Sequence, residues 1–106
     1  MKLGIIVNTN NAETAWNTLR LANEALARSN QTTIFLLGSG VEIVAIKDKT
    51  FNIDEGMNRF LGNGGNLLAC GTCLKLRDQE AGICSISTMS ELVKVISDSD
   101  KVVTFG

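Results

Sequence analysis

Hydrophobic residues come in short runs, separated by longer segments in which they recur at helical spacing. The first run, Leu3 to Val7, is nearly continuous, as expected of a strand buried on both faces. From Ala12 to Arg28 the apolar residues fall on one stripe, which predicts a helix. Thr32 to Leu37 is a second apolar, β-branched run. Residues 1 to 37 therefore form a strand, helix, strand pattern, the crossover unit of a parallel sheet.

Capping boxes mark two further helices, because a polar cap residue is followed three positions later by glutamate. Asn52 with Glu55 opens one helix, and Thr88 with Glu91 opens the other. The glycine-rich segment 62 to 65 ends the first of them. The side chains expected to face the core are Ile53, Met57, Phe60 and Leu61 in the first helix, and Met89, Leu92, Val93 and Ile96 in the second.

Two more apolar runs complete the pattern, one ending at Cys70 and the other from Lys101 to Phe105. Val41 to Ile46 could be a helical turn, and Ile83 to Ile86 is ambiguous between a short edge strand and a loop. Strands that alternate with helices are typical of an α/β fold. We therefore expect a three-layer α/β/α architecture with a mostly parallel sheet of four to five strands.

The composition is that of a globular protein, with 44% hydrophobic and 20% charged residues. At 106 residues, the chain has the length of one domain, so we expect a single domain spanning residues 1–106. The formal charge of −1 comes from interspersed signs, so no nucleic-acid or anionic-membrane partner is predicted. The N-terminal apolar run is too short for a signal peptide or a membrane span. We expect a cytoplasmic protein.

Polar and glycine residues follow three of the predicted strands, where the carboxyl ends of a parallel sheet hold ligands and catalytic groups. Asn8, Thr9 and Asn10 follow the first strand, and Gly38 follows the second, which makes them candidate binding residues. Gly38-Ser39-Gly40 begins like a dinucleotide-binding fingerprint. However, it follows the second strand and has Ile43 at the third glycine position, which favours a simple turn over a nucleotide site.

The end of the third predicted strand holds the candidate catalytic residues, two cysteines. Cys70 ends the strand and Cys73 lies in the first turn of the expected helix, where unpaired backbone N–H groups favour a thiolate. Arg77 shares the face of Cys73, so its guanidinium is expected to approach both thiols and lower their pKa further. Cys70 and Cys73 are the candidate catalytic residues, with Gly71, Thr72 and Arg77 as candidate binding residues. A thiolate can attack the outer sulfur of a persulfide or disulfide.

The composition disfavours several other cysteine chemistries. The chain has no histidine, which excludes Ser-His-Asp and Cys-His catalysis and histidine-ligated zinc. It has no proline, whereas thioredoxin-like folds place a cis-proline against their cysteine pair. A second Cys-x-x-Cys pair is missing, so no metal site and no cofactor is predicted. A redox dithiol stays open, and Cys84 is either a small core residue or a functional thiol.

The cysteine stretch and the closing segment also resemble a known family. Cys70-Gly71-Thr72-Cys73, followed by Leu76-Arg77 and by Asp100 to Phe105, is similar to the DsrE/DsrF-like proteins, particularly their small YchN-like members. The resemblance covers essentially the whole chain. It implies an α/β/α fold, a homotrimer, a homohexamer or a heteromeric ring, and a cysteine that carries sulfur as a persulfide.

By this resemblance, Cys70 matches the sulfur-carrying cysteine of the DsrE and TusD branch, and Cys73 matches the second cysteine of the YchN-like branch only. The chain departs from the family pattern at Asp78, where a glycine commonly follows the arginine. It also departs in pairing its two thiols. A neighbouring thiol could resolve a persulfide into a disulfide and release sulfide.

We therefore expect a sulfur-relay protein that accepts sulfane sulfur on Cys70 from a donor protein and passes it to an acceptor, with Cys73 assisting or resolving. The alternative is a non-enzymatic oligomeric module that binds a small ligand or acts as a thiol-redox pair. Val41 to Ile46 and Ile83 to Ile86 are the candidate subunit interfaces, because we do not expect a chain this short to bury both internally.

Overall fold

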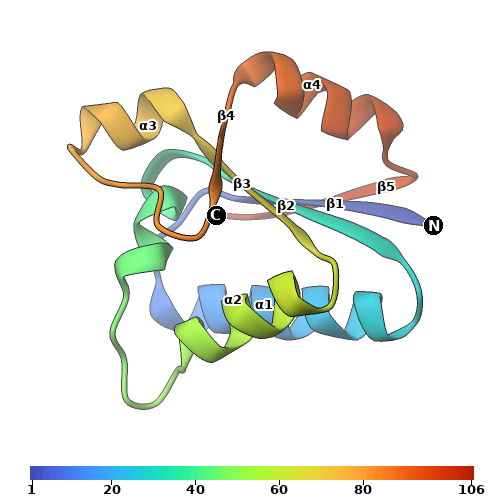
Figure 1. Ribbon diagram of the computed structural model, residues 1–106, viewed down its shortest axis with the longest axis horizontal. Coiled ribbons are helices and arrows are strands. Elements are labelled where there is room, and N and C mark those ends of the chain that lie inside the picture. The colour runs from blue at the N-terminus through green and yellow to red at the C-terminus, as the bar shows by residue number, and fades with distance from the viewer.

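A five-stranded parallel sheet organises the computed structural model, which describes residues 1–106. The strands are β1 (Lys2–Val7), β2 (Gln31–Leu36), β3 (Asn66–Cys70), β4 (Ser85–Ser87) and β5 (Lys101–Phe105). The helices are α1 (Ala12–Ala27), α2 (Ile53–Gly62), α3 (Gly71–Leu76) and α4 (Met89–Asp98), with a 3₁₀ helix η1 (Gly38–Ala45). The strand order is β4-β3-β2-β1-β5, and every neighbouring pair is parallel (Figure 1).

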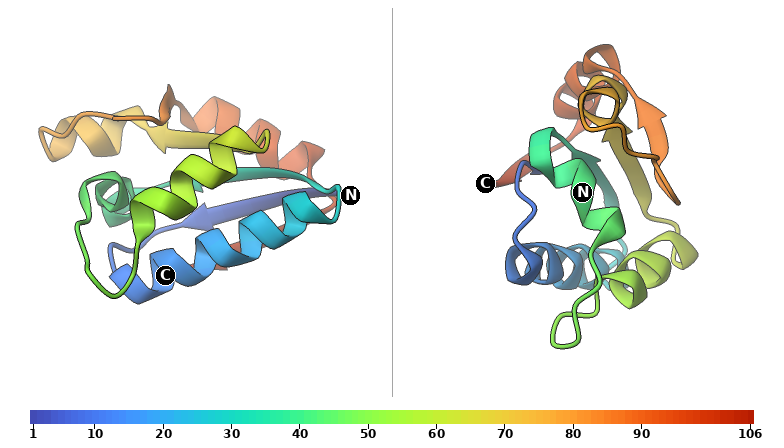
Figure 2. Two further views of the ribbon diagram at one scale, coloured as in Figure 1. Left: turned by 60° about the horizontal axis from the view of Figure 1, so that its bottom comes forward. Right: turned by 90° about the vertical axis from the view of Figure 1, so that its left-hand side faces the viewer.

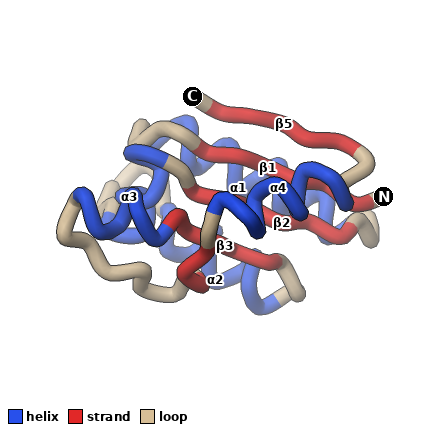
Figure 3. The backbone as a smooth tube through the Cα atoms, turned by 90° about the horizontal axis from the view of Figure 1, so that it is seen from above, coloured by secondary structure: helices blue, strands red, loops and turns tan.

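The helices form one layer on each side of this sheet. α1 and α2 lie side by side on one face, and α4 covers the other (Figures 2 and 3). The topology explains this division, because the right-handed crossovers from β1 to β2 and from β2 to β3 step in the same direction and put their helices on one face. The connection from β4 back to β5 runs the opposite way, so α4 lies on the opposite face. The predicted three-layer α/β/α fold is confirmed.

The helices begin where the sequence predicts them. At the start of α1, α2 and α4, the cap side chain accepts a hydrogen bond from the backbone N–H three positions later, at 2.9–3.2 Å. These bonds satisfy N–H groups that the helices themselves leave unpaired. The cap residues are Asn11, Asn52 and Thr88. Both predicted capping residues, Asn52 and Thr88, are thus confirmed.

The segment from Val41 to Ile46 is helical but lies deeper than expected. It belongs to η1, which already begins at Gly38 and crosses the carboxyl end of the sheet. Val41 and Ile43 are completely buried within the chain itself. The fold itself therefore covers Val41 and Ile43 without a subunit interface. Val44 and Ile46 are only partly buried, so an interface at this end of the segment stays a prediction.

The inner face of α4 also differs from the prediction. Leu92 is buried, and Val95 packs against the core beside Gly4 of β1. Met89, Val93 and Ile96, expected to be buried, instead lie on the solvent side of the helix. The capping box set the start of α4 correctly, but the helix carries apolar residues on two sides and only one of them reaches the sheet.

The edge of the sheet beyond β3 is short. In the ambiguous segment from Ile83 to Ile86, only Ser85 and Ile86 belong to a strand. They open β4, which pairs with β3 over three residues. Ile83 and Ile86 are both exposed, so this candidate interface stays a prediction. No helix of the structure combines the length and the apolar character needed to cross a membrane.

Candidate functional site

Cys70 lies at the point where β3 gives way to α3. The last four residues of β3 are buried, and the Cys70 side chain is only 3% exposed. Its sulfur accepts a hydrogen bond from the backbone N–H of Cys73, with an N to Sγ distance of 3.5 Å. Cys70 is therefore the N-cap of α3, which fixes the direction of its thiol toward the first turn of that helix.

Cys73 is partly exposed and is held from a different part of the chain. The backbone N–H of Gly38 donates to its sulfur at 3.2 Å. Burial raises the pKa of the Cys73 thiol, and its hydrogen bond with the Cys70 thiol raises that pKa further. The Gly38 N–H and the charge of Arg77 act in the opposite direction but do not overcome these effects. The expectation of a lowered pKa is wrong for Cys73, because desolvation outweighs the nearby donors.

Arg77 does not point its guanidinium at the thiols as expected. It donates to the carboxylate of Glu42 at 2.9 Å and to the backbone carbonyl of Cys73 at 3.2 Å. Glu42 comes from η1 and also accepts a hydrogen bond from the side chain of Asn10 at 3.3 Å. The hydrogen bond from Arg77 is the main reason that the pKa of Glu42 lies below its usual value. A carboxylate that the sequence analysis overlooked thus competes for the guanidinium.

These contacts bring most of the predicted site residues together. Gly38 contacts Cys73, and Asn10 joins Arg77 through Glu42. Asn8 adjoins Gly38, where a side chain would collide with the Asn8 amide oxygen, at 2.1 Å from an added Cβ. Thr9 is not part of the cluster. Its hydroxyl accepts a hydrogen bond from the backbone of Asn11 within the turn that precedes α1.

An open cavity of about 950 Å³ borders the cysteines. Its walls are the junction of β3 and α3 from Cys70 to Lys75, the loop from Asp78 to Ala81, and the junction of β4 and α4 from Ile86 to Met89. Gly71 and Thr72 therefore line this cavity together with both thiols. This volume is within the range of small-molecule sites.

Two polar residues of this region were missed by the sequence analysis. Glu42 is the only charged residue in the apolar stretch from Val41 to Ile46, and that isolation was a usable signal. Ser87 ends β4 beside the cavity, and its hydroxyl is buried without a hydrogen-bond partner. No pattern in the sequence distinguishes Ser87 from the neighbouring serines, because its placement depends on strand pairing.

Cys84 takes no part in the cluster. Its side chain is buried, and burial raises the pKa of its thiol to about 11. It packs with the hydrophobic core, as one of the two interpretations of this residue proposed. All three cysteines are free thiols.

The shifted pKa of Cys84 makes the stability of the fold pH-dependent at alkaline pH. An unfolded thiol ionises near its ordinary pKa of 9.0, whereas the folded one holds its proton up to about 11. The contribution of Cys84 to stability is therefore complete below pH 9.0, falls as the pH rises, and levels off above about 11. We expect Cys84→Ala to flatten this decline in urea unfolding measured across that range. Parallel profiles for both proteins would contradict this prediction.

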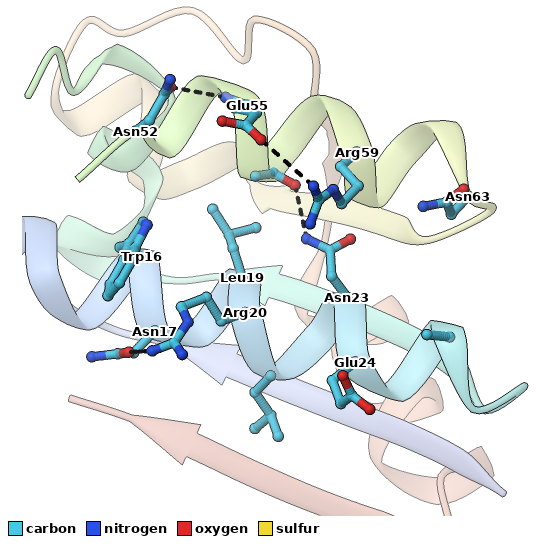
Figure 4. A pocket seen from close by; sticks show the side chains of 13 residues that line it. Trp16, Asn17, Leu19, Arg20, Asn23, Glu24, Asn52, Glu55, Arg59 and Asn63 are labelled. Carbon is cyan, nitrogen blue, oxygen red and sulfur yellow. Dashed lines mark hydrogen bonds and ion pairs between the residues drawn. The ribbon is translucent and has the colours of Figure 1, made fainter. Parts of the chain in front are cut away.

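A second cavity, of about 790 Å³, lies between α1 and α2 on the opposite face of the sheet from α4 (Figure 4). Among its lining residues, Arg20 stacks over the ring of Trp16, with 4.6 Å between the guanidinium carbon and the ring centre. Asn23 bridges the two helices by donating to the backbone carbonyl of Gly56 at 3.2 Å. No cysteine lines this groove, and its charged side chains pair within their own helices, as Arg59 does with Glu55.

Comparison with known sequences identifies relatives that span nearly the same length. A model of the DsrE/DsrF-like family matches residues 1–105. The uncharacterized protein MJ0989 of Methanocaldococcus jannaschii is 30% identical over 100 residues, covering 88% of both chains. The uncharacterized protein MK0008 of Methanopyrus kandleri is 32% identical over 101 residues, covering 88% of this chain and 83% of its own.

Solved structures share the fold at lower identity. The conserved protein BT1422 from Bacteroides thetaiotaomicron, described as of unknown function, has a TM-score of 0.80 at 22% identity, covering 98% of this chain and 94% of its own. MTH1491 from Methanobacterium thermoautotrophicum, also described as of unknown function, has a TM-score of 0.76 at 10% identity, covering 96% and 97%. At these identities, the two solved structures show that they share the fold of this chain, and they carry no conclusion about its function.

Proposed function

Because the chain belongs to the DsrE/DsrF-like family, we propose that it is a sulfur-relay protein that carries sulfane sulfur as a persulfide on Cys70. The observation that carries this proposal is the place of Cys70. It lies at the carboxyl end of β3, an inner strand of the parallel sheet. Its sulfur accepts a hydrogen bond from the first turn of α3, and the residue borders an open cavity.

The transfer is a thiol exchange at sulfur. The Cys70 thiolate attacks the outer sulfur of a donor persulfide, so that a new S–S bond forms on Cys70. The S–S bond of the donor breaks, and the donor leaves as a thiolate with the bonding electron pair. The reverse chemistry, with an acceptor thiolate attacking the outer sulfur, unloads the protein. No net oxidation or reduction occurs in either step.

The role we assign to Cys73 is assistance. Because its pKa is raised, Cys73 is a thiol and not a thiolate at neutral pH. A thiol donates a hydrogen bond to its neighbour but is a poor nucleophile, so it does not readily displace sulfide from a Cys70 persulfide. The Gly38 N–H keeps the Cys73 sulfur in place while the Cys73 N–H supports that of Cys70.

The direct test is mass spectrometry of the protein after incubation with a small persulfide donor. Wild-type protein should gain the mass of one sulfur atom, on the peptide that contains Cys70, and should lose it on addition of a thiol acceptor. Protein that gains no sulfur under conditions that load a known persulfide carrier would contradict the proposal.

The contact between the two thiols favours one alternative, a thiol-redox function. Attack of Cys73 on a Cys70 persulfide would form a Cys70–Cys73 disulfide and release sulfide, with the outer sulfur leaving with the electron pair. The same experiment separates the two functions. Sulfide in the supernatant together with a protein lighter by two hydrogen atoms indicates resolution, whereas a stable sulfur adduct indicates carriage.

We further propose that the protein works as a homo-oligomer, trimer or hexamer, in the cytoplasm, where sulfur donor and acceptor proteins meet it. Support comes from the exposed side of α4, where Met89, Val93 and Ile96 recur at helical spacing and form an apolar stripe. Ile86 of β4, 68% exposed, lies just before the helix. Large apolar side chains gathered on one face are typical of subunit contacts.

Val93→Asp is expected to convert the oligomer to a monomer in light scattering at micromolar concentration. Val93 is 62% exposed in the single chain, so the carboxylate costs the folded monomer little, whereas an interface would have to desolvate it. Lys94→Asp is the matched control, since it puts the same side chain on the neighbouring, exposed position of α4 outside the stripe. An unchanged mass for Val93→Asp would rule the stripe out as the interface.

A further inference from the structure

Ser87 is a buried polar residue that lacks a partner. Its side chain is 3% exposed, and its hydroxyl oxygen makes no hydrogen bond within the protein. A buried hydroxyl without a partner destabilises a fold, so proteins rarely keep one without a use for it. The serine two residues earlier on the same strand, Ser85, is exposed to solvent and carries no such cost.

The register of the sheet places Ser87 directly beside Cys70. β3 and β4 pair in parallel with Cys70 opposite Ser87, and Leu68 opposite Ser85 (β4 stands beside β3 in Figure 1). Side chains of paired residues in neighbouring strands point to the same face, and the strands lie about 4.8 Å apart. Ser87 and Cys70 therefore project from the same face at neighbouring strand ends, and both border the cavity.

A sulfur added to Cys70 would change the environment of this hydroxyl. The S–S bond extends the Cys70 side chain by about 2 Å, and the outer sulfur of a persulfide carries the negative charge when it is ionised. An anionic acceptor next to an unpartnered hydroxyl is the arrangement that gives a strong hydrogen bond. The free Cys70 sulfur does not make this bond, since the Ser87 hydroxyl has no partner in the unloaded protein.

We propose that Ser87 recognises the loaded state, by donating a hydrogen bond from its hydroxyl to the outer sulfur of the Cys70 persulfide. The assignment rests on the proposed function of Cys70. It makes Ser87 a sulfur-binding residue that favours the anionic persulfide and retains it until an acceptor thiolate attacks. The loading step is the one described above, in which a donor persulfide loses its outer sulfur and leaves as a thiolate.

The test compares Ser87→Ala with Ser85→Ala and the wild type. Each protein is loaded with a small persulfide donor and then alkylated with iodoacetamide at a series of pH values. The anionic persulfide displaces iodide, and mass spectrometry counts the alkylated persulfide on Cys70. Ser87→Ala should fold at least as stably as the wild type, because it removes an unsatisfied hydroxyl.

Loss of the hydrogen bond disfavours the anion, so Ser87→Ala should raise the pH midpoint of alkylation by about one unit, which is a roughly tenfold lower rate at pH values well below the wild-type midpoint. Ser85→Ala should match the wild type. If Ser87→Ala also matches the wild type, the role of Ser87 is overturned while carriage on Cys70 stands. If the wild type takes up no sulfur on Cys70, both proposals are overturned.

Discussion

Cys70→Ser is expected to abolish sulfur loading, whereas Cys73→Ala should still load at a reduced rate. A serine hydroxyl stays protonated at neutral pH and cannot form a persulfide, so the loss at position 70 should be complete. Removing the Cys73 thiol takes away a hydrogen-bond donor to Cys70 but keeps the backbone N–H of residue 73. A decrease of roughly tenfold is expected from the loss of one such bond. Persulfide mass spectrometry over a time course measures both effects.

Cys84→Ser is the matched control for these two variants, because it removes a thiol that lies outside the cluster and ionises only near pH 11. It should load at the wild-type rate. The opposite pattern, with loading on Cys73 in the Cys70→Ser protein, would make Cys73 the carrier. Cys73 is the more exposed of the two thiols, which makes it the alternative site of sulfur loading that this experiment distinguishes.

Local patterns predicted the fold because each of them reports on local physics. The near-continuous apolar runs became parallel strands, and the capping boxes at Asn52 and Thr88 became helix starts. Cys70 falls at a strand end for the same reason, since the apolar run of β3 ends there. These features depend on neighbours in the sequence, which a single chain displays directly.

The errors arose where distant segments meet. The outward stripe of α4 was assigned to the core, because a helix with apolar residues on two sides does not reveal which side meets the sheet. Arg77 was expected to face the thiols, and only the fold brings Glu42 close enough to take its guanidinium. The raised pKa of Cys73 likewise depends on how deeply α3 packs, which outweighs its position at a helix start.

The site around Cys73 depends on contacts between α3 and η1, which follow two different strands. η1 supplies Gly38, which contacts Cys73, and Glu42, which contacts Arg77. Its position depends in turn on close packing against β1. The backbone carbonyl of Val7 accepts a hydrogen bond from Leu37 at 2.9 Å just before η1 begins. Within η1, Gly40 lies so close to β1 that a Cβ would collide with the Val7 backbone.

Gly40→Ala is therefore expected to destabilise the fold by about 3 kcal/mol, a drop in melting temperature of roughly 12 °C or more. An added Cβ would lie 2.1 Å from the carbonyl oxygen of Val7. That oxygen belongs to a strand paired on both sides, with β2 and β5, so it has no freedom to retreat. η1 must shift instead, which moves Gly38 away from the sulfur of Cys73. Thermal or urea unfolding measures the effect.

Gly62→Ala is the control for this substitution, because nothing lies within 4 Å of the added Cβ and the residue ends α2 in an ordinary backbone conformation. Alanine there should raise stability by about 0.5 kcal/mol, through its higher helix propensity. The same substitution, glycine to alanine, is thus expected to lower the stability of the fold at position 40 and to raise it at position 62. Equal stability of both variants would show that η1 has room to move, and that the contact between Gly38 and Cys73 does not depend on close packing at Gly40.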